Sequence, residues 1–395
     1  MKVCFLTGEY PPMQGGIADH TAQLARQIIE LGAEVSILTS SKAAASSDTP
    51  FSHLVRPQVY PVIRQWNVGC WQHIRRWLGE QRPDVLHIQY QAAAFDLGGW
   101  INWLPWWLRR WPDRPRLVVT FHDLRVPYLF PKAGPLRWRS MLALARYCDA
   151  VIVTNEEDRQ TLISHSLLAA CLNLVPLGSN VEPKPPSDYD REGWRASLGI
   201  REQTLLLAYF GFLNASKGGE ELVMALQDLA SRGYDAHLLM IGGQVGDVDP
   251  TNRAYAERVR GLIQAHGLGE RVHWTGHTSV EEVSANLLAA DVVVMPYRDG
   301  VSFRRTTFIA ALRHGQAVIT TQPSLPLPEL RDGHNVLLVP PCHVEALVAA
   351  VVHVAHDPNL RRSLAAGAQA LGEHFEWGQI ARKTMAVYSG WPSAS

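Results

Sequence analysis

The sequence predicts an α/β protein built from two doubly wound parallel-sheet domains, and three observations lead to this prediction. The chain has 395 residues, more than one ordinary domain holds and enough for two. Strand-like apolar runs alternate with amphipathic helical segments, a pattern typical of parallel sheets covered by helices on both faces. The alternation is interrupted near residue 182 by a stretch rich in proline and acidic residues, and then begins again.

The first domain is predicted over residues 1–182. Its opening strand, KVCFLTG, leads through a loop with glycine and proline into an amphipathic helix that ends at Gly32. The strand EVSILTS follows directly. Helical segments separate most of the later strands, which are predicted at residues 84–90, 116–123, 150–155 and 173–178.

The second domain is predicted over residues 191–372, after a linker at 183–190. A strand at 205–211 and a helix at 219–233 open it. Later strands are predicted at residues 236–243, 271–276, 291–297 and 317–321. In doubly wound sheets ligands bind at the carboxyl ends of the strands, so two facing sheets would share one cleft.

Composition excludes several classes of function. The 37 basic and 37 acidic residues cancel, so the chain has no overall charge that would attract nucleic acid. Five scattered cysteines without a CxxC pair predict neither a disulfide framework nor a zinc site, and they indicate a reducing compartment. The amino terminus is apolar for too few residues to be a secretory signal, and no long apolar run predicts a membrane span. A cytoplasmic protein is expected.

Two loops at strand ends are candidate anion sites. Gly15 and Gly16 stand immediately before a helix, where backbone N–H groups can approach an anion. The alternative is a purely structural double glycine, and the loop lacks the GxGxxG pattern of dinucleotide sites. Lys217 precedes the helix that begins near residue 218 and could neutralise a phosphate oxygen. The alternative there is a solvated surface lysine.

Five segments together resemble the retaining glycosyltransferases of family 4. They occur in the family's order and spacing: GEYPPMQGGIADHTAQLA, VVTFHD, FGFLNASKGG, RVHWTGHTSVEEVSANLLAADVVVMPY and PELRDGHNVLLVPP. The resemblance covers nearly the whole chain. It implies the GT-B fold, with two facing Rossmann-like domains and an interdomain cleft for a nucleotide-sugar. The segment 373–395 is similar to the family's last helices, which return to the first domain.

The resemblance also implies an activity and roles for single residues. It implies transfer of a sugar from a nucleotide-sugar to a hydroxyl acceptor, with retention of anomeric configuration and without a metal or other cofactor. The acceptor class stays open among glycans, lipid-linked molecules and small molecules. Gly16 matches the glycine that meets the donor diphosphate, Lys217 the diphosphate-binding lysine, and His122 the histidine near the donor sugar. The alternative for His122 is a core histidine, and the adjacent Asp123 could orient a hydroxyl or cap a turn.

The chain departs from the family pattern at three positions. Phe212 replaces the usual arginine before the lysine, and the usual two glutamates fall on Ser302 and Ala310. The loop DGVSFRR instead resembles a subgroup with a GVS-x-RR loop.

Its two arginines are candidate replacements for the missing arginine. A retaining transfer through a front-face route chiefly needs the departing diphosphate stabilised, and a guanidinium can bind two phosphate oxygens at once. We therefore expect Arg304 or Arg305 to act in catalysis, next to Thr306 and Thr307 in the first turn of the following helix. The alternative is that one arginine pairs with Asp299 to hold the loop together. The ribose contact is unassigned, with Asp299 and Ser302 as candidates.

Tryptophans are concentrated in one region of the first domain. Nine of the 13 are Trp66, Trp71, Trp77, Trp100, Trp103, Trp106, Trp107, Trp111 and Trp138. Within residues 100–111 they alternate with Arg109 and Arg110. Three interpretations remain open: a core helix, a peripheral contact with the inner face of a membrane, and a platform on which acceptor sugars stack.

Three classes of function follow from the sequence. The first is a nucleotide-sugar-dependent glycosyltransferase. The second is a GT-B pseudoenzyme that binds a nucleotide-sugar or a partner without turnover, suggested by the missing glutamates. The third is another GT-B enzyme, such as a nucleotide-sugar epimerase, whose own carboxylate set is not found in this sequence. The donor base, the sugar and the oligomeric state are not encoded in any recognisable motif.

Overall fold

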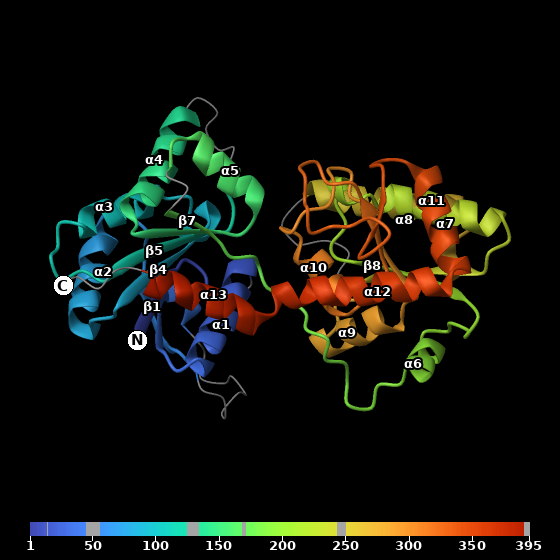
Figure 1. Ribbon diagram of the computed structural model, residues 1–395, viewed down its shortest axis with the longest axis horizontal. Helices are drawn as coiled ribbons and strands as arrows, with labels where there is room; N and C mark the ends of the chain where they lie inside the picture. The colour runs from blue at the N-terminus through green and yellow to red at the C-terminus, as the bar shows by residue number, and fades with distance from the viewer. Residues whose placement is uncertain (14, 45–55, 125–133, 168–170, 243–249, 391–395) are drawn as a thin grey trace. The chain divides into compact units, whose positions relative to one another are not determined.

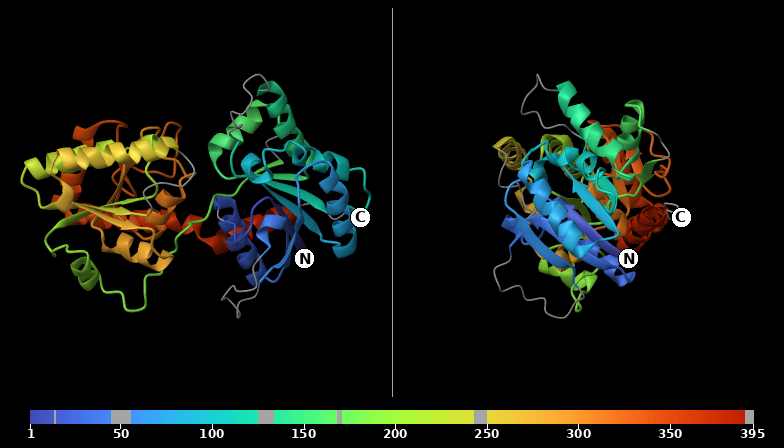
Figure 2. Two further views of the ribbon diagram at one scale, coloured as in Figure 1. Left: turned by 180° about the vertical axis from the view of Figure 1, so that it is seen from behind. Right: turned by 90° about the vertical axis from the view of Figure 1, so that its left-hand side faces the viewer.

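The structure is a computed structural model that describes residues 1–13, 15–44, 56–124, 134–167, 171–242 and 250–390 (Figure 1). The chain divides into two compact units. The first combines residues 1–178 with the segment from residue 377 onward, and the second spans residues 179–376. Each unit is one parallel sheet with helices on both faces, as Figures 1 and 2 show.

The first unit contains a seven-stranded sheet in the order β3-β2-β1-β4-β5-β6-β7. All neighbouring strands pair in parallel. The strands are β1 Lys2–Thr7, β2 Glu34–Ser40, β3 Gln58–Ile63, β4 Val85–Tyr90, β5 Arg116–Phe121, β6 Ala150–Val153 and β7 Leu172–Leu174. The direction of strand order reverses between β1 and β4, the place where doubly wound sheets bind ligands.

Helices cover both faces of this sheet. α1 (Gly16–Glu30) and α13 (Trp377–Ser389) lie side by side on one face (Figure 1). The opposite face packs against α2 Gly69–Gln81, α3 Leu104–Leu108, α4 Gly134–Tyr147 and α5 Glu156–Ser164. Side chains of β4 alternate between the faces: Val85 joins the α1/α13 core, whereas Leu86 and Ile88 join the other.

The second unit contains a six-stranded parallel sheet in the order β10-β9-β8-β11-β12-β13. Its strands are β8 Leu205–Phe210, β9 Ala236–Ile241, β10 Val272–Gly276, β11 Val292–Met295, β12 Val318–Thr321 and β13 Leu337–Val339. The helices of this unit are α6 Arg191–Ser197, α7 Gly219–Ser231, α8 Pro250–Ala265, α9 Val280–Ala289, α10 Thr306–Arg313, α11 Val344–His356 and α12 Pro358–Gly372. Here the reversal of strand order lies between β8 and β11, so the loops after these two strands are neighbours.

The prediction of two doubly wound parallel sheets is confirmed. The boundaries of the units differ slightly from the expected ones, since the first unit ends at Gly178 rather than at 182 and resumes at Trp377 rather than at 373. The last five residues of the expected tail lie outside the described residues. Two strands were not predicted, β3 and β13. Both are edge strands, and β3 contains Pro61, which an edge tolerates because one side of its backbone needs no partner.

Aspartates tie neighbouring strands together at the amino ends of both sheets. Asp84 accepts a hydrogen bond from the backbone N–H of Lys2, and Asp149 accepts one from Leu117. In the second unit Asp291 accepts one from Leu206. Because each aspartate directly precedes a strand, its carboxylate satisfies an N–H group that the start of the neighbouring strand leaves unpaired.

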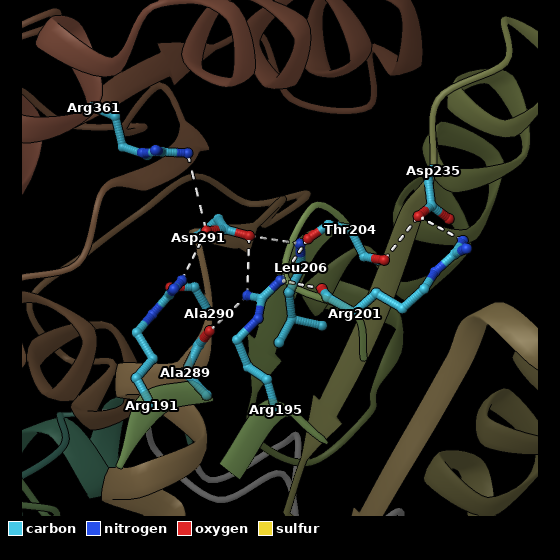
Figure 3. A network of polar contacts seen from close by, with 10 residues as sticks. All are labelled: Arg191, Arg195, Arg201, Thr204, Leu206, Asp235, Ala289, Ala290, Asp291 and Arg361. Atoms are coloured by element: carbon cyan, nitrogen blue, oxygen red, sulfur yellow. Dashed lines mark hydrogen bonds and ion pairs between the residues drawn. The ribbon is translucent and has the colours of Figure 1, made fainter. Parts of the chain in front are cut away.

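Asp291 is also the centre of an arginine cluster (Figure 3). Its carboxylate lies 2.8 Å from Arg191, 3.1 Å from Arg195 and 4.0 Å from Arg361. The Arg195 side chain is only 2% exposed. Its guanidinium also donates to three backbone carbonyls, those of Ala289, Arg201 and Thr204. The cluster fastens α6 to the sheet of the second unit.

Candidate functional site

The loop between β1 and α1 ends in the predicted double glycine. A Cβ atom on Gly15 would lie 2.2 Å from the carboxylate of Glu9, which is the end of a flexible side chain and can move aside, so packing alone does not require glycine here. Gly16 is the first residue of α1 and has open space around its α-carbon. Among the described residues no side chain caps this helix, which leaves the N–H groups of its first turn available to an anion. The geometry is therefore compatible with the anion-binding interpretation, and it gives no packing reason for the double glycine.

His122 follows β5 at the carboxyl edge of the same sheet. Its backbone N–H bonds to the carbonyl of Tyr90, and its ring Nε2 lies 2.7 Å from Oε1 of Gln89. The ring meets that of His20 edge-on, with centroids 4.6 Å apart. Burial lowers the pKa of His122 to about 4, so the ring is neutral near pH 7. His122 is half-buried rather than enclosed in the core.

A buried polar network lies directly beneath His122. It contains His20 of α1, His87 and Gln89 of β4, Thr120 of β5 and Tyr388 of α13. None of these residues was predicted from the sequence. A signal was available, because β4 and β5 place polar residues at every second position, in LHIQY and VTFHD, on faces that are otherwise apolar.

In the second unit, the loops after β8 and β11 are in contact. The backbone N–H of Arg298 bonds to the carbonyl of Ser216 at 2.8 Å. Gly218 has φ +70°, and a Cβ atom there would lie 1.9 Å from the carbonyl oxygen of Pro296. Only glycine permits both this backbone conformation and this close approach. The packing places Lys217, the residue before Gly218, at the junction of the two loops.

Lys217 extends toward Gly211 at the end of β8. Its Nζ lies 3.2 Å from the point that a Cβ atom on Gly211 would occupy, and Thr307 of α10 lies 3.3 Å from the same point. Burial, and second the charge of Arg305, lower the pKa of Lys217 to about 8. Within the part of the chain that the structure describes, the amine makes no hydrogen bond and no ion pair. The solvated surface lysine is thus not what the structure contains.

Arg305 immediately precedes α10 and stands beside this lysine. Its guanidinium pairs with Asp299 and stacks on the ring of Tyr297, with 3.9 Å between Cζ and the ring centroid. The Arg305 side chain is 16% exposed, and that of Asp299 is 48% exposed. One arginine therefore does pair with Asp299, as the scaffolding interpretation expects, and the same arginine is the one next to Lys217.

The remaining predicted residues of this loop have less definite surroundings. Ser302 accepts a backbone hydrogen bond from Arg305 through its carbonyl, and Thr306 begins α10. The arginine whose charge lowers the pKa of Lys217 is Arg305, the second of the two in this loop. Phe212, at the position of the missing arginine, is 53% exposed. Tyr297 and Gly211 were not predicted, since neither a buried tyrosine nor a strand-end glycine is distinctive in a single sequence.

The tryptophan-rich region combines core and surface. Trp66, Trp71 and Trp77 are buried in the core on the α2/α4 face of the first sheet. In contrast, Trp100, Trp103 and Trp106 are 50%, 37% and 36% exposed. The core interpretation is therefore right for one part of the region and wrong for the other.

Arginine side chains lie over one exposed and two half-buried tryptophan rings of this region. Cζ of Arg110 lies 3.7 Å from the ring centroid of Trp106, and Cζ of Arg75 lies 5.7 Å from that of Trp107 and 5.8 Å from that of Trp111. We use the name aromatic–basic surface for the exposed Trp100, Trp103 and Trp106 together with Arg75 and Arg110. Among the described residues, no helix is both long enough and apolar enough to cross a bilayer.

Two family descriptions match the chain, one for each unit. Residues 15–178 match the Glycosyl transferase 4-like domain, and residues 190–371 match Glycosyl transferases group 1. The chain therefore carries one glycosyltransferase domain of each type. It is thus a nucleotide-sugar-dependent glycosyltransferase with the GT-B fold, which decides against the epimerase considered from the sequence.

Individual relatives are distant but cover nearly the full length of this glycosyltransferase. D-inositol 3-phosphate glycosyltransferase from Corynebacterium diphtheriae is 24% identical over 98% of this chain and 94% of its own. Phosphatidyl-myo-inositol mannosyltransferase from Mycolicibacterium smegmatis is 24% identical over 95% and 90%. Among solved structures, HepE from Anabaena in complex with UDP has a TM-score of 0.74 at 18% identity, covering 99% of this chain and 100% of its own. This structural likeness shows the shared fold.

Proposed function

We propose that this glycosyltransferase transfers a sugar with retention of anomeric configuration, and that Lys217 and Arg305 hold the diphosphate of its donor. The observation that supports the proposal is the state of Lys217: a half-buried amine, beside a second cation, without a hydrogen bond or ion pair among the described residues. Removing a charge from water is costly unless a partner compensates it. An anionic ligand would supply that partner.

The chemistry of the proposed transfer needs positive charge at this place. As the bond between the sugar and the diphosphate breaks on a front-face route, negative charge develops on the departing phosphate oxygens. Fixed cations in a partly desolvated site stabilise that charge more effectively than water does. Arg305 then takes the place of the family's usual arginine, whose position is occupied by Phe212. In this proposal the 299–305 loop binds the diphosphate in the manner of the GVS-x-RR subgroup. The transfer then requires no metal cofactor.

The first unit supplies the other proposed contacts. The open first turn of α1 at Gly16 would meet the diphosphate, and His122 would bind a hydroxyl of the donor sugar. Asp299 and Ser302 remain the candidates for the ribose. For the acceptor, the named relatives act on an inositol phosphate and on phosphatidyl-inositol. We therefore propose a hydroxyl acceptor with a phosphorylated or lipid-linked polyol as the first class to screen.

A donor screen by nucleotide release tests the proposal. UDP-glucose is the first candidate, because the HepE chain with the same fold has been solved with it. Arg305→Ala should lower turnover roughly 10- to 150-fold, the value of one charge-assisted hydrogen bond of about 1.5–3 kcal/mol. Arg305→Lys should restore only part of the loss, since lysine cannot bind two oxygens in a fixed fork. Arg304→Ala serves as the matched control and should lose less.

Three outcomes separate the alternatives. Retention is read from the anomeric proton of the product by NMR. Tight binding of a nucleoside diphosphate without release from any donor would instead support the pseudoenzyme. If Arg304→Ala and Arg305→Ala both bind a nucleoside diphosphate and turn over as the parent does, the loop is scaffolding and the proposed role of Arg305 is wrong.

We further propose that the aromatic–basic surface contacts an anionic membrane. Tryptophan rings favour the headgroup level of a bilayer, and Arg75 and Arg110 fit its negative charge. Trp103→Ser with Trp106→Ser should reduce sedimentation with anionic vesicles, while neutral vesicles bind neither protein. Leu174→Ser, which removes another exposed apolar side chain of the first unit, is the control. Quenching of tryptophan fluorescence by soluble sugars, with vesicle binding unchanged, would favour acceptor stacking.

A further inference from the structure

The buried polar network below His122 stands out against the apolar core around it. Strand alternation places His87 and Gln89 of β4 on the face covered by α1 and α13, together with Thr120 of β5. His87 and Gln89 are completely buried, and Thr120 is 3% exposed. Burying so many polar groups is unfavourable unless each is hydrogen-bonded. An apolar stripe would have been the simpler way to pack these two helices.

The network is a continuous chain of hydrogen bonds from α13 to the strand end. The hydroxyl of Tyr388 lies 2.6 Å from Nδ1 of His87, and Oγ1 of Thr120 lies 2.7 Å from Nε2 of the same ring. The amide nitrogen of Gln89 lies 3.3 Å from Nε2 of His87. The amide oxygen of Gln89 lies 2.7 Å from Nε2 of His122. Each member thus restricts the orientation of the next.

The last bond has a consequence for the proton on His122. A carboxamide oxygen can only accept, so Nε2 of His122 must carry the hydrogen. A neutral imidazole has one N–H group and one lone pair, which leaves the lone pair on Nδ1. Nδ1 has no hydrogen-bond partner among the residues that the structure describes. It is therefore an acceptor available to a ligand at the carboxyl edge of the sheet.

We propose that Gln89 is a positioning residue that fixes His122 as the Nε2–H tautomer, so that Nδ1 accepts a hydrogen bond from a hydroxyl of the donor sugar. The role of Nδ1 rests on the proposed function; the tautomer does not. The titratable groups that face His122 are His20 from α1 and His87 from β4, with Asp123 next in the chain and Tyr388 of α13 one ring further away. Burial lowers the pKa of both His20 and His87.

Nitrogen-15 NMR of the full-length protein measures the tautomer directly and requires no substrate. The parent should show His122 protonated on Nε2 alone. Gln89→Leu removes the acceptor at nearly equal volume, so both tautomers should appear and turnover should fall roughly tenfold, the value of one neutral hydrogen bond. Thr120→Val removes the hydrogen bond to His87 and leaves the one between Gln89 and His122 in place, so it should not change the His122 tautomer.

Gln89→Glu gives a signature that a purely structural role would not produce. A carboxylate still accepts from Nε2, but its charge favours the imidazolium and raises the pKa of His122. Below the raised pKa, Nδ1 carries a hydrogen and can no longer accept, so turnover should fall as the pH decreases through that value. The parent should lack this acidic limb above about pH 5, as burial keeps its His122 neutral there.

The outcomes distinguish this inference from the proposed function. A parent His122 protonated on Nδ1, or a tautomer unaffected by Gln89→Leu, overturns the inference even if every donor-site variant behaves as proposed. Normal turnover of His122→Ala overturns the role of Nδ1. The proposed function itself fails on different variants, those of Lys217 and Arg305.

Discussion

Two cationic groups in residues 179–376 differ in how their buried charge is compensated. In the Asp291 cluster, the buried guanidinium of Arg195 meets a carboxylate and three backbone carbonyls (Figure 3). At the junction of the β8 and β11 loops, the amine of Lys217 meets no acceptor in the described part of the chain, and a neighbouring cation, Arg305, lowers its pKa further. Both groups are rich in positive charge, but only in the first does a carboxylate of the protein compensate the buried cation.

The difference is the one expected between a structural cluster and the ligand site that we propose at Lys217. A compensated buried cation holds elements together, and its loss leaves a partner unpaired. An uncompensated one reduces stability in the free protein and gains its partner when an anion binds. Mutations should therefore affect the free energy of unfolding at Asp291 and ligand affinity at Lys217.

The largest effect is expected at Asp291. Asp291→Ala leaves the buried Arg195 without its counter-charge and should lower the free energy of unfolding by roughly 3–5 kcal/mol. Denaturant titration measures this change. The control is Glu80→Ala, whose partner Arg76 is 83% exposed, with an expected loss of about 1 kcal/mol or less for the ion pair. Equal losses of unfolding free energy in the two variants would contradict the structural role of the Asp291 cluster.

Lys217→Met should lower ligand affinity and leave the free energy of unfolding undiminished, the opposite of Asp291→Ala. The variant keeps an apolar stem but removes the charge, so nucleoside diphosphate affinity should fall roughly 10- to 150-fold while the free energy of unfolding does not decrease. Calorimetry and denaturant titration of one preparation give both values. Lys184→Met, at an exposed lysine of the same unit, should change neither. A destabilised Lys217→Met protein with normal affinity would assign Lys217 a structural role.

The affinity for a nucleoside diphosphate should also depend on pH. The pKa of Lys217 is about 8, below its ordinary value, so the charged amine predominates below pH 8 and is lost above it. A bound anion favours the charged form, so affinity should be constant below about pH 8 and fall by up to about tenfold per pH unit above it. Calorimetry between pH 7 and 9.5 tests this. Lys217→Arg should remove the dependence, because arginine stays charged.

The smallest effect is expected at Asp299. Its ion pair with Arg305 is partly exposed and is worth about 1 kcal/mol or less. Asp299→Asn frees Arg305 for the ligand, so nucleoside diphosphate affinity should rise by up to about fivefold. A loss of affinity would instead assign Asp299 to the ribose, the role left open by the missing glutamates. Binding of inorganic pyrophosphate separates the cases, since it contains no ribose.

Much of the fold was predictable because the local sequence pattern specifies the strands and helices. Strands β1, β2, β4, β8 and β9 were predicted nearly to the residue, because apolar and β-branched residues predominate in them. The edge strand β3 escaped prediction because Pro61 interrupts its sequence QVYPVI, and β13 because its apolar run LLV has only three residues. Gly16, His122 and Lys217 were found at strand ends by their place in the alternation and by the family pattern, and the structure puts each at the carboxyl edge of its sheet.

The sequence by itself thus determined two parallel sheets, the family and the loops that carry the candidate site. Only the tertiary structure decided which residues meet: Arg305 rather than Arg304 beside Lys217, Gln89 below His122, and Trp100, Trp103 and Trp106 at the surface. The physical reason is the separation along the chain. His122 and Gln89 are 33 positions apart, and His87 and Tyr388 are 301 apart. Local pattern sets the face on which a side chain lies, whereas the packing of distant elements sets its neighbours.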